Sequence, residues 1–256
     1  MKTNQLVKAL LVLLLFQFSA LQAQDKYQMF WVHEDRVKPA KAMEYEGIVK
    51  ELVSAMTEHN IQDVNWITMA SSDFRYAYVS PIANMAELDE DGFAPLREKM
   101  GKEAFADMFS RMDECYNDHT EYILTLDPEL SYMPDGMTQT PEGENYRENG
   151  IYYFSPANYG KAIEIAKKFK DLYIEKGSPL HYRVYRSGFG ADGTYLMVAI
   201  AAKDAGHLEE KSNANEELLG DDLNKLRAEI LTVMESNREM KGWVRKDLAY
   251  SSKSNK

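Results

Sequence analysis

HYRVYRSGFGADGTYLMVAIAA, residues 181–202, is the stretch of sequence that decides the fold. Two runs rich in aromatic and β-branched residues enclose GFGADG, residues 188–193, whose glycines allow the positive backbone φ angles of a tight hairpin. Residues 64–80, VNWITMASSDFRYAYVS, repeat this arrangement around SDF. A nucleotide-binding glycine motif would need a helix after it, and here a strand follows, so the glycines indicate a turn rather than a phosphate site.

Each hairpin is preceded by an aromatic strand and a helix, and is followed by a second helix and a strand. The first strands are YQMFWVHE, residues 27–34, and GIYYF, residues 150–154, and each runs into a proline and a helical apolar pattern. The second helices have apolar faces, formed by Leu96, Met100, Phe105, Met108, Phe109 and Met112 in the first half and by Leu219, Leu223, Leu226, Ile230, Val233 and Met234 in the second. Of these we expect Met108, Met112, Leu226 and Ile230 to be buried. The closing strands with their tails are ILTLDPELSY, which ends at Tyr132, and GWVRKDLAY, which ends at Tyr250. The order in each half is βαββαβ, the split unit of ferredoxin-like folds.

One such unit leaves a face of its sheet bare, and two units can cover each other. The sequence therefore predicts an α+β protein made of two tandem βαββαβ ferredoxin-like repeats, packed sheet to sheet as an intramolecular dimeric α/β barrel. The expected organisation is a signal peptide at residues 1–23, a first repeat at 24–132, a linker at 133–149 and a second repeat at 150–256. The linker is rich in Pro, Gly and polar residues and has no hydrophobic period.

The N-terminus has the pattern of a secretory signal: a basic start, a short apolar run and small residues near Ala23. We expect an exported protein, periplasmic or secreted, with no membrane contact after cleavage, because no second long apolar stretch follows. Losing the signal, with its two lysines and no acidic residue, takes the net charge from −11 to −13. Such an acidic chain is a poor partner for nucleic acid. Cys115, the single cysteine, lies in an apolar helical pattern that favours a buried thiol.

This layout of aromatic strands resembles the dimeric α/β-barrel superfamily, whose members include NIPSNAP-like proteins, antibiotic-biosynthesis-type monooxygenases and stress-responsive barrel proteins. The resemblance covers the whole mature chain and rests on the order of the elements, so no functional residue is transferred from it. It implies a cavity between sheet and helices of the kind that holds small apolar or aromatic molecules. Fold alone does not define function.

The end of the first strand carries a histidine and an acid that would point the same way, His33 and Asp35. The pair suits a general base with an orienting carboxylate, or two metal ligands. A metal site needs a third ligand, and neither His59 nor His119 lies in a ligand-spaced motif, so no metal site is predicted. The alternative is structural, with Asp35 satisfying backbone amides and His33 exposed. The second half has Ser155, Pro156 and Ala157 in that place.

Aromatic and basic side chains on the strands form a broader candidate site for a small molecule. Its members are Trp31, Trp66, Arg75, Tyr76, Tyr78, Arg183 and Tyr185. A strand arginine that points inward needs an anionic partner, which a ligand could supply. The same aromatic residues also suit an ordinary core between sheets.

Three functions follow from these patterns: a module that binds a small apolar or aromatic molecule, a cofactor-independent monooxygenase or isomerase with His33 as base, or a structural protein with a solid core. No cofactor is predicted, and the sequence leaves self-association open. An enzyme predicts one open, polar pocket in the first half. A structural role predicts no pocket above about 300 Å³, the lower bound for ligand sites.

Overall fold

The computed structural model describes residues 27–252, so the predicted signal peptide lies outside the described residues. In the first half the main elements are β1 (Gln28–Val37), α2 (Ala42–Glu58), β2 (Asn65–Ser71), β3 (Arg75–Ile82), α3 (Ala94–Met100), α4 (Lys102–Asp113) and β4 (Tyr116–Tyr132). In the second half they are β5 (Tyr146–Phe154), α5 (Pro156–Lys176), β6 (Tyr182–Ser187), β7 (Tyr195–Ala202), α6 (Ala205–Leu231), β8 (Met234–Val244) and β9 (Tyr250–Ser251). Short 3-10 turns lie at Pro39–Lys41, Met85–Asp89 and Lys246–Leu248. Within the described range, no helix is both long enough and apolar enough to cross a membrane.

The strands form one closed antiparallel barrel. Eight of them pair in the order β3-β1-β4-β6-β7-β5-β8-β2, and the pairing of β2 with β3 closes the ring. The two halves meet where β4 pairs with β6 and where β2 pairs with β8. The predicted α+β barrel is confirmed, but the two sheets join at their edges instead of packing face to face. The reason is that an edge strand has unpaired N–H and C=O groups, and closure satisfies them.

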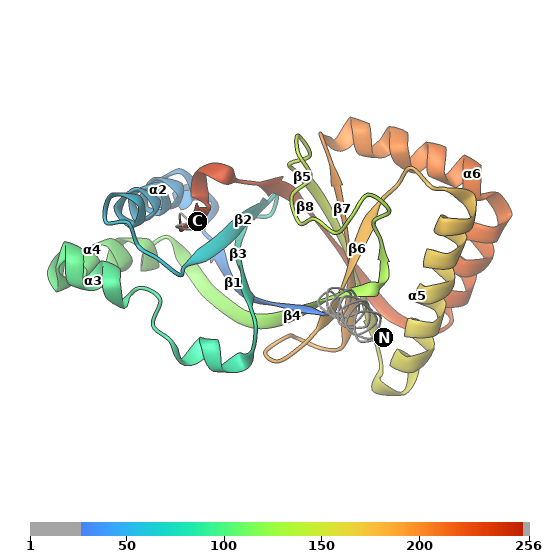
Figure 1. Ribbon diagram of the computed structural model, residues 1–256, viewed down its shortest axis with the longest axis horizontal. Coiled ribbons are helices and arrows are strands. Elements are labelled where there is room, and N and C mark those ends of the chain that lie inside the picture. The colour runs from blue at the N-terminus through green and yellow to red at the C-terminus, as the bar shows by residue number, and fades with distance from the viewer. Residues whose placement is uncertain (1–26, 253–256) are drawn as a thin grey trace, which may run out of the picture.

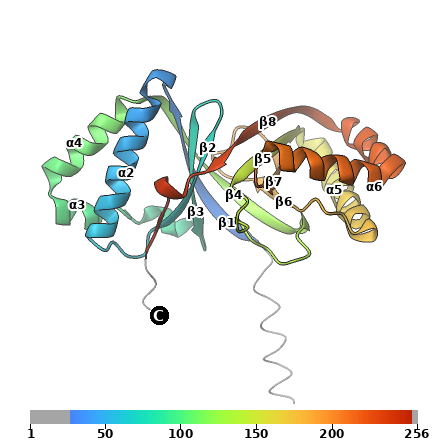
Figure 2. The same ribbon diagram turned by 90° about the horizontal axis from the view of Figure 1, so that it is seen from above.

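The helices cover the outside of the barrel on two opposite sides, with α2, α3 and α4 over the first half and α5 and α6 over the second (Figures 1 and 2). Alternate strand residues therefore divide between the barrel interior and the helix-covered outer face. The interior is a mixed cluster from both halves, formed by Phe30, Val32, Ala77, Leu124, Leu126, Ile151, Tyr185, Tyr195, Met197 and Ala199. Two further apolar clusters lie under the two groups of helices.

The last strand segment of each half contacts the other half in the same way. The hydroxyl of Tyr250 donates to the carbonyl of Ile61, 2.6 Å away, just beyond the end of α2. The hydroxyl of Tyr132 donates to the carbonyl of Ser178, 3.1 Å away, just beyond the end of α5. Each tyrosine thus forms a hydrogen bond with the turn that follows the first long helix of the other half.

Several expectations from the sequence are confirmed. The segment GFGADG forms the β6–β7 hairpin, with φ of +78° at Gly190 and +91° at Gly193. Cys115, Met108 and Met112 are buried.

Other expectations are wrong. Leu226 and Ile230 are only half-buried. The second half's last strand begins at Met234, eight residues before the expected GWVRKDLAY, so Val233 and Met234 leave the helix. Strand β5 begins at Tyr146, inside the predicted linker, because residues 146–149 pair with both β7 and β8.

Candidate functional site

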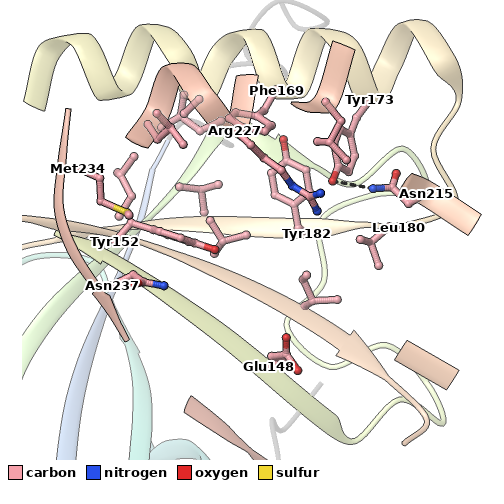
Figure 3. Close-up of a pocket in the computed structure, with 18 of the residues that line it drawn as sticks. Glu148, Tyr152, Phe169, Tyr173, Leu180, Tyr182, Asn215, Arg227, Met234 and Asn237 are labelled. Carbon is pink, nitrogen blue, oxygen red and sulfur yellow. Dashed lines mark hydrogen bonds between the residues drawn. The ribbon is translucent and has the colours of Figure 1, made fainter. Parts of the chain in front are cut away.

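Two pockets lie between the outer face of the barrel and the helices. The larger, the second-half pocket, has a volume of about 640 Å³ and lies under α5 and α6 (Figure 3). Its apolar walls come from strands and helices together: Leu130, Tyr152, Phe154, Ala166, Phe169, Tyr173, Leu180, Tyr182, Val184, Leu196, Val198, Ile200, Leu223, Ile230, Leu231 and Met234. Leu226 and Ile230 are half-buried and pack against the apolar cluster under α5 and α6, and Ile230 also lines the pocket.

A few polar groups are set into these apolar walls. Tyr173 accepts a hydrogen bond from the side-chain amide of Asn215, 2.9 Å away, as the dashed line in Figure 3 marks. Arg227 lies at the rim and pairs with Glu216 at 2.6 Å. The buried hydroxyl of Tyr182 has no hydrogen-bond partner within the described residues. Burial raises the pKa of Tyr182, so its hydroxyl is a neutral donor that a bound polar group can satisfy.

The smaller, the first-half pocket, has a volume of about 330 Å³ and lies under α2 and α4. Five of the residues singled out in the sequence line it: Trp31, His33, Asp35, Trp66 and Tyr78. The indole N–H of Trp66 donates to the carbonyl of Leu248 at 2.9 Å, which fixes this wall. The strand period of two places Trp31, His33 and Asp35 on the same outer face of β1.

His33 stands between two carboxylates. Its Nε2 is 3.0 Å from Asp35 Oδ1, and its Nδ1 is 3.2 Å from Glu121 Oε1. Burial lowers the pKa of His33, but hydrogen bonds and charge from Asp35 and Glu121 outweigh that effect and raise it. Asp35 is 2% exposed, so the structural expectation of an exposed histidine beside a capping aspartate does not describe this pair.

Two tyrosines complete the surroundings of Asp35. The hydroxyl of Tyr45, from α2, donates to Asp35 Oδ2 and lies 2.7 Å from the hydroxyl of Tyr78. Burial is the leading cause that raises the pKa of both phenols, so both remain neutral at physiological pH. Tyr45 was missed in the sequence because its helical spacing made it one more core residue.

A second histidine joins this cluster from β4. His119 is the direct cross-strand partner of Asp35, and its ring centroid is 5.1 Å from that of His33. One ligand atom each from His33, Asp35 and His119 lie within 4.8 Å of one another. The sequence expectation of no metal site rested on the absence of a local spacing motif. Pairing of β1 with β4 supplies the third residue from 84 positions away, which no local spacing reveals.

The other four predicted binding residues lie elsewhere. Tyr76 packs under α2, where its hydroxyl donates to Glu46 at 2.8 Å. Arg75 pairs with Glu34 at 2.9 Å and with Asp73 at 2.8 Å.

Arg183 and Tyr185 face the barrel interior. Arg183 donates to the carbonyls of Thr138 and Gln139, both at 2.6 Å, and the hydroxyl of Tyr185 donates to the side chain of Gln139. Backbone carbonyls of the loop before β5 thus accept the hydrogen bonds of Arg183 Nη1, while its buried Nε has no hydrogen-bond partner within the described residues.

The sequence alignment of the His33–Asp35 pair with residues 155–157 of the second half is wrong. Ser155 is not a strand residue but caps α5, and its hydroxyl accepts from the amide of Asn158. Counted back from Pro39 and Pro156, His33 and Asp35 correspond to Gly150 and Tyr152. Both lie on the outer face of β5.

Comparison with solved structures places the chain among ferredoxin-type barrel folds. A candidate monooxygenase from Lactobacillus acidophilus NCFM aligns with a TM-score of 0.53 and 9% sequence identity, over 89% of this chain and 97% of that one. An anthrone oxidase-like protein aligns with a TM-score of 0.55 and 12% identity, over 87% and 93%. A mutant chlorite dismutase from Candidatus Nitrospira defluvii aligns with a TM-score of 0.51 and 8% identity, over 86% and 92%. No family model and no curated sequence matches the chain. At these identities the likeness concerns the fold.

Proposed function

We propose that this protein binds a small apolar or aromatic molecule in the second-half pocket. The observation that carries the proposal is a pocket of about 640 Å³ whose lining includes Tyr182, a buried hydroxyl without a hydrogen-bond partner among residues 27–252. Ligand sites typically measure about 300–1,000 Å³ and combine apolar walls with a few placed polar groups. A solid structural core would leave no pocket of this size.

The ligand class follows from the lining. Phe169, Tyr152 and Tyr173 offer ring faces and edges, which favour a flat or aromatic molecule. The hydroxyl of Tyr182 favours a ligand with one hydrogen-bond acceptor at its buried end. Glu148, Glu216 and Glu239 line the same pocket, so a strongly anionic molecule is disfavoured.

Export and internal duplication belong to the same proposal. Export is supported by the signal-peptide pattern of residues 1–23. Duplication of one βαββαβ unit is supported by the shared order of elements and by the mirrored contacts of Tyr132 and Tyr250. An exported barrel with two unlike pockets suits capture of a small molecule outside the cytoplasm.

Binding can be tested with an uncharged aromatic fluorophore such as N-phenyl-1-naphthylamine, titrated into the purified protein. Ala166→Trp places an indole in the second-half pocket and should weaken probe affinity at least about tenfold, since the volume it fills is needed by the probe. Ala214→Trp, on an exposed part of α6, is the matched control and should bind like the wild type. Equal affinity in all three proteins, or no binding by the wild type, would reject the proposal.

A second candidate function is general-base catalysis by His33 in the first-half pocket. It is favoured by the 3.0 Å contact between His33 and Asp35 at the pocket wall. His33→Ala should then abolish turnover of a substrate found by screening, with the melting temperature nearly unchanged. Full activity in that variant would remove His33 from the mechanism.

A further inference from the structure

We propose that His33, Asp35 and His119 bind a divalent transition-metal ion of the zinc type at the wall of the first-half pocket. This inference does not depend on ligand binding in the second-half pocket, which uses other residues on the far side of the barrel. It assigns a role to His119, which neither the apolar core nor the pocket lining accounts for.

The strand register brings the three residues together on one face. Asp35 pairs directly with His119, and His33 pairs directly with Glu121, so all four side chains leave the sheet on the helix side. The distance from His33 Nε2 to Asp35 Oδ1 is 3.0 Å. Ligands held at 2.0–2.1 Å around a tetrahedral ion lie roughly 3.3 Å apart, so this pair is close to the required separation. His119 is exposed and its ring can turn to close the 4.8 Å set.

The surrounding groups suit an outer shell of a metal site. A ligating histidine usually donates its other ring N–H to a carboxylate, and Glu121 lies 3.2 Å from His33 Nδ1. A ligating carboxylate is usually hydrogen-bonded as well, and the hydroxyl of Tyr45 donates to Asp35 Oδ2. Oδ1 of Asp35 and Nε2 of His33 thus remain as the ligand atoms, with their opposite sides already held.

The charge and burial of Asp35 also favour a bound cation. Asp35 is 2% exposed. Within the described residues its only ion-pair partner is His33, and no lysine or arginine there forms an ion pair with it. A buried carboxylate needs compensation by a cation or by hydrogen bonds. A divalent ion would supply that compensation while both histidines remain neutral, as metal binding requires.

Three protein ligands leave one position of a tetrahedral ion open. Sites with three protein ligands and an open position are typical of catalytic rather than structural zinc. His33 and Asp35 also line the first-half pocket, beside Trp31, Trp66 and Tyr78. A molecule in this pocket would therefore meet the open position of the metal within aromatic walls.

The competing interpretation is an ion-pair network, with a protonated His33 between Asp35 and Glu121 and with His119 as a bystander. The two interpretations differ in what His119 does. In the ion-pair network His119 is dispensable, whereas in the metal site it is a ligand. Because His119 is exposed, its replacement should leave the melting temperature of the metal-free protein nearly unchanged.

The experiment is a Zn²⁺ titration of the chelator-treated, tag-free protein against a chromophoric competitor. We expect one tight equivalent in the wild type, at least about 100-fold weaker binding in His119→Ala, and wild-type binding in His59→Ala, a histidine remote from the cluster. Addition of Zn²⁺ should raise the melting temperature of the wild type and of His59→Ala but not that of His119→Ala.

Co²⁺ provides a second measurement, because its visible absorption is strong in a four-coordinate protein site and weak in the six-coordinate aqua ion. That absorption should disappear in both His119→Ala and Asp35→Asn. Zn²⁺ binding that is absent in the wild type, or that persists unchanged in His119→Ala, would overturn the proposal and leave the ion-pair network.

Discussion

The two pockets occupy corresponding places under the helices, yet they differ at corresponding positions. The first-half pocket has His33 and Asp35 on β1, with Glu121 and His119 as their partners on β4. Gly150 and Tyr152 stand at those positions on β5, and their partners on β8 are Glu239 and Asn237. The second half keeps a glutamate at the position of Glu121. It has other residue types in place of both histidines and of Asp35.

This difference shows how one architecture accommodates two kinds of site. A Cβ added to Gly150 would lie 2.7 Å from the hydroxyl of Tyr152, so that ring folds back over the glycine. In the second half a phenol ring therefore fills the space that an imidazole uses in the first. The result is a pocket of about 640 Å³ without a histidine in the second half, and a pocket of about 330 Å³ lined by His33 and Asp35 in the first half.

The largest expected effect concerns how tightly each half packs its second helix. Met108 on α4 is fully buried, whereas Leu226 on α6 is half-buried beside the second-half pocket. Met108→Ala should cost about 2–5 kcal/mol of unfolding free energy through lost transfer energy and cavity formation. Leu226→Ala should cost about 1 kcal/mol, because a half-buried side chain loses less transfer energy when it is shortened. Equal losses in urea unfolding would mean that α6 packs as tightly as α4.

The next effect concerns the support of Asp35. Tyr45→Phe removes the donor to Asp35 Oδ2 and the neighbour of the Tyr78 hydroxyl. Hydrogen bonds to charged groups contribute about 1.5–3 kcal/mol, so stability should fall by about that amount in a chemical melt. The matched change Tyr173→Phe in the second half touches only the neutral amide of Asn215 and should cost about 0.5–1.5 kcal/mol. A smaller loss for Tyr45→Phe than for Tyr173→Phe would contradict the assigned network.

A smaller effect, of opposite sign, is expected in the second-half pocket. Tyr182→Phe removes a buried hydroxyl that lacks a hydrogen-bond partner in the part of the chain that the structure describes. Loss of an unsatisfied buried group should leave stability unchanged or raise it by about 1 kcal/mol, while affinity for an acceptor-bearing ligand falls. A destabilisation of more than about 1 kcal/mol in a thermal melt would mean that the hydroxyl has a partner in solution.

The smallest effect concerns the C-terminal segment, which has an ion pair with the first half. The hydrogen bond from Arg245 lowers the pKa of Glu46 and outweighs burial, which raises it. A hydrogen bond from Arg245 also lowers the pKa of Asp247. A lowered folded-state pKa contributes stability above the unfolded value, near 4.3 for Glu, that is lost as the pH falls through the folded value. Arg245→Met should therefore cost no more than about 1 kcal/mol at pH 7. Its melting curve should approach that of the wild type below about pH 4, and a difference that grows on acidification would refute this sign.

The sequence was sufficient for the elements that depend on local patterns. The hairpin at GFGADG, the helical face that contains Met108 and the common order βαββαβ all follow from periods of two or 3.6 and from glycine chemistry. The mutual closure of two sheets into one barrel depends on which strand edges meet, and no local period records that. Strand β8 was expected too short because MESNREM, residues 234–240, is polar, and tertiary pairing with β5 overrides its low strand propensity.

The candidate site was predictable in part for the same reason. Trp31, His33 and Asp35 share one strand, so their common direction followed from a period of two. Trp66 and Tyr78 joined them through the aromatic pattern of the hairpin. His119, Glu121 and Tyr45 could not be placed, because their positions depend on the register of β4 against β1 and on the packing of α2.

The most direct test of the division between the two pockets is one native mass spectrometry experiment. Wild type, Ala166→Trp and His119→Ala are each mixed with one equivalent of Zn²⁺ and an excess of the uncharged aromatic probe. We expect the wild type to carry both, Ala166→Trp to carry Zn²⁺ alone, and His119→Ala to carry the probe alone. A wild type that carries neither, or variants that lose both together or lose neither, would contradict two independent pockets of different chemistry.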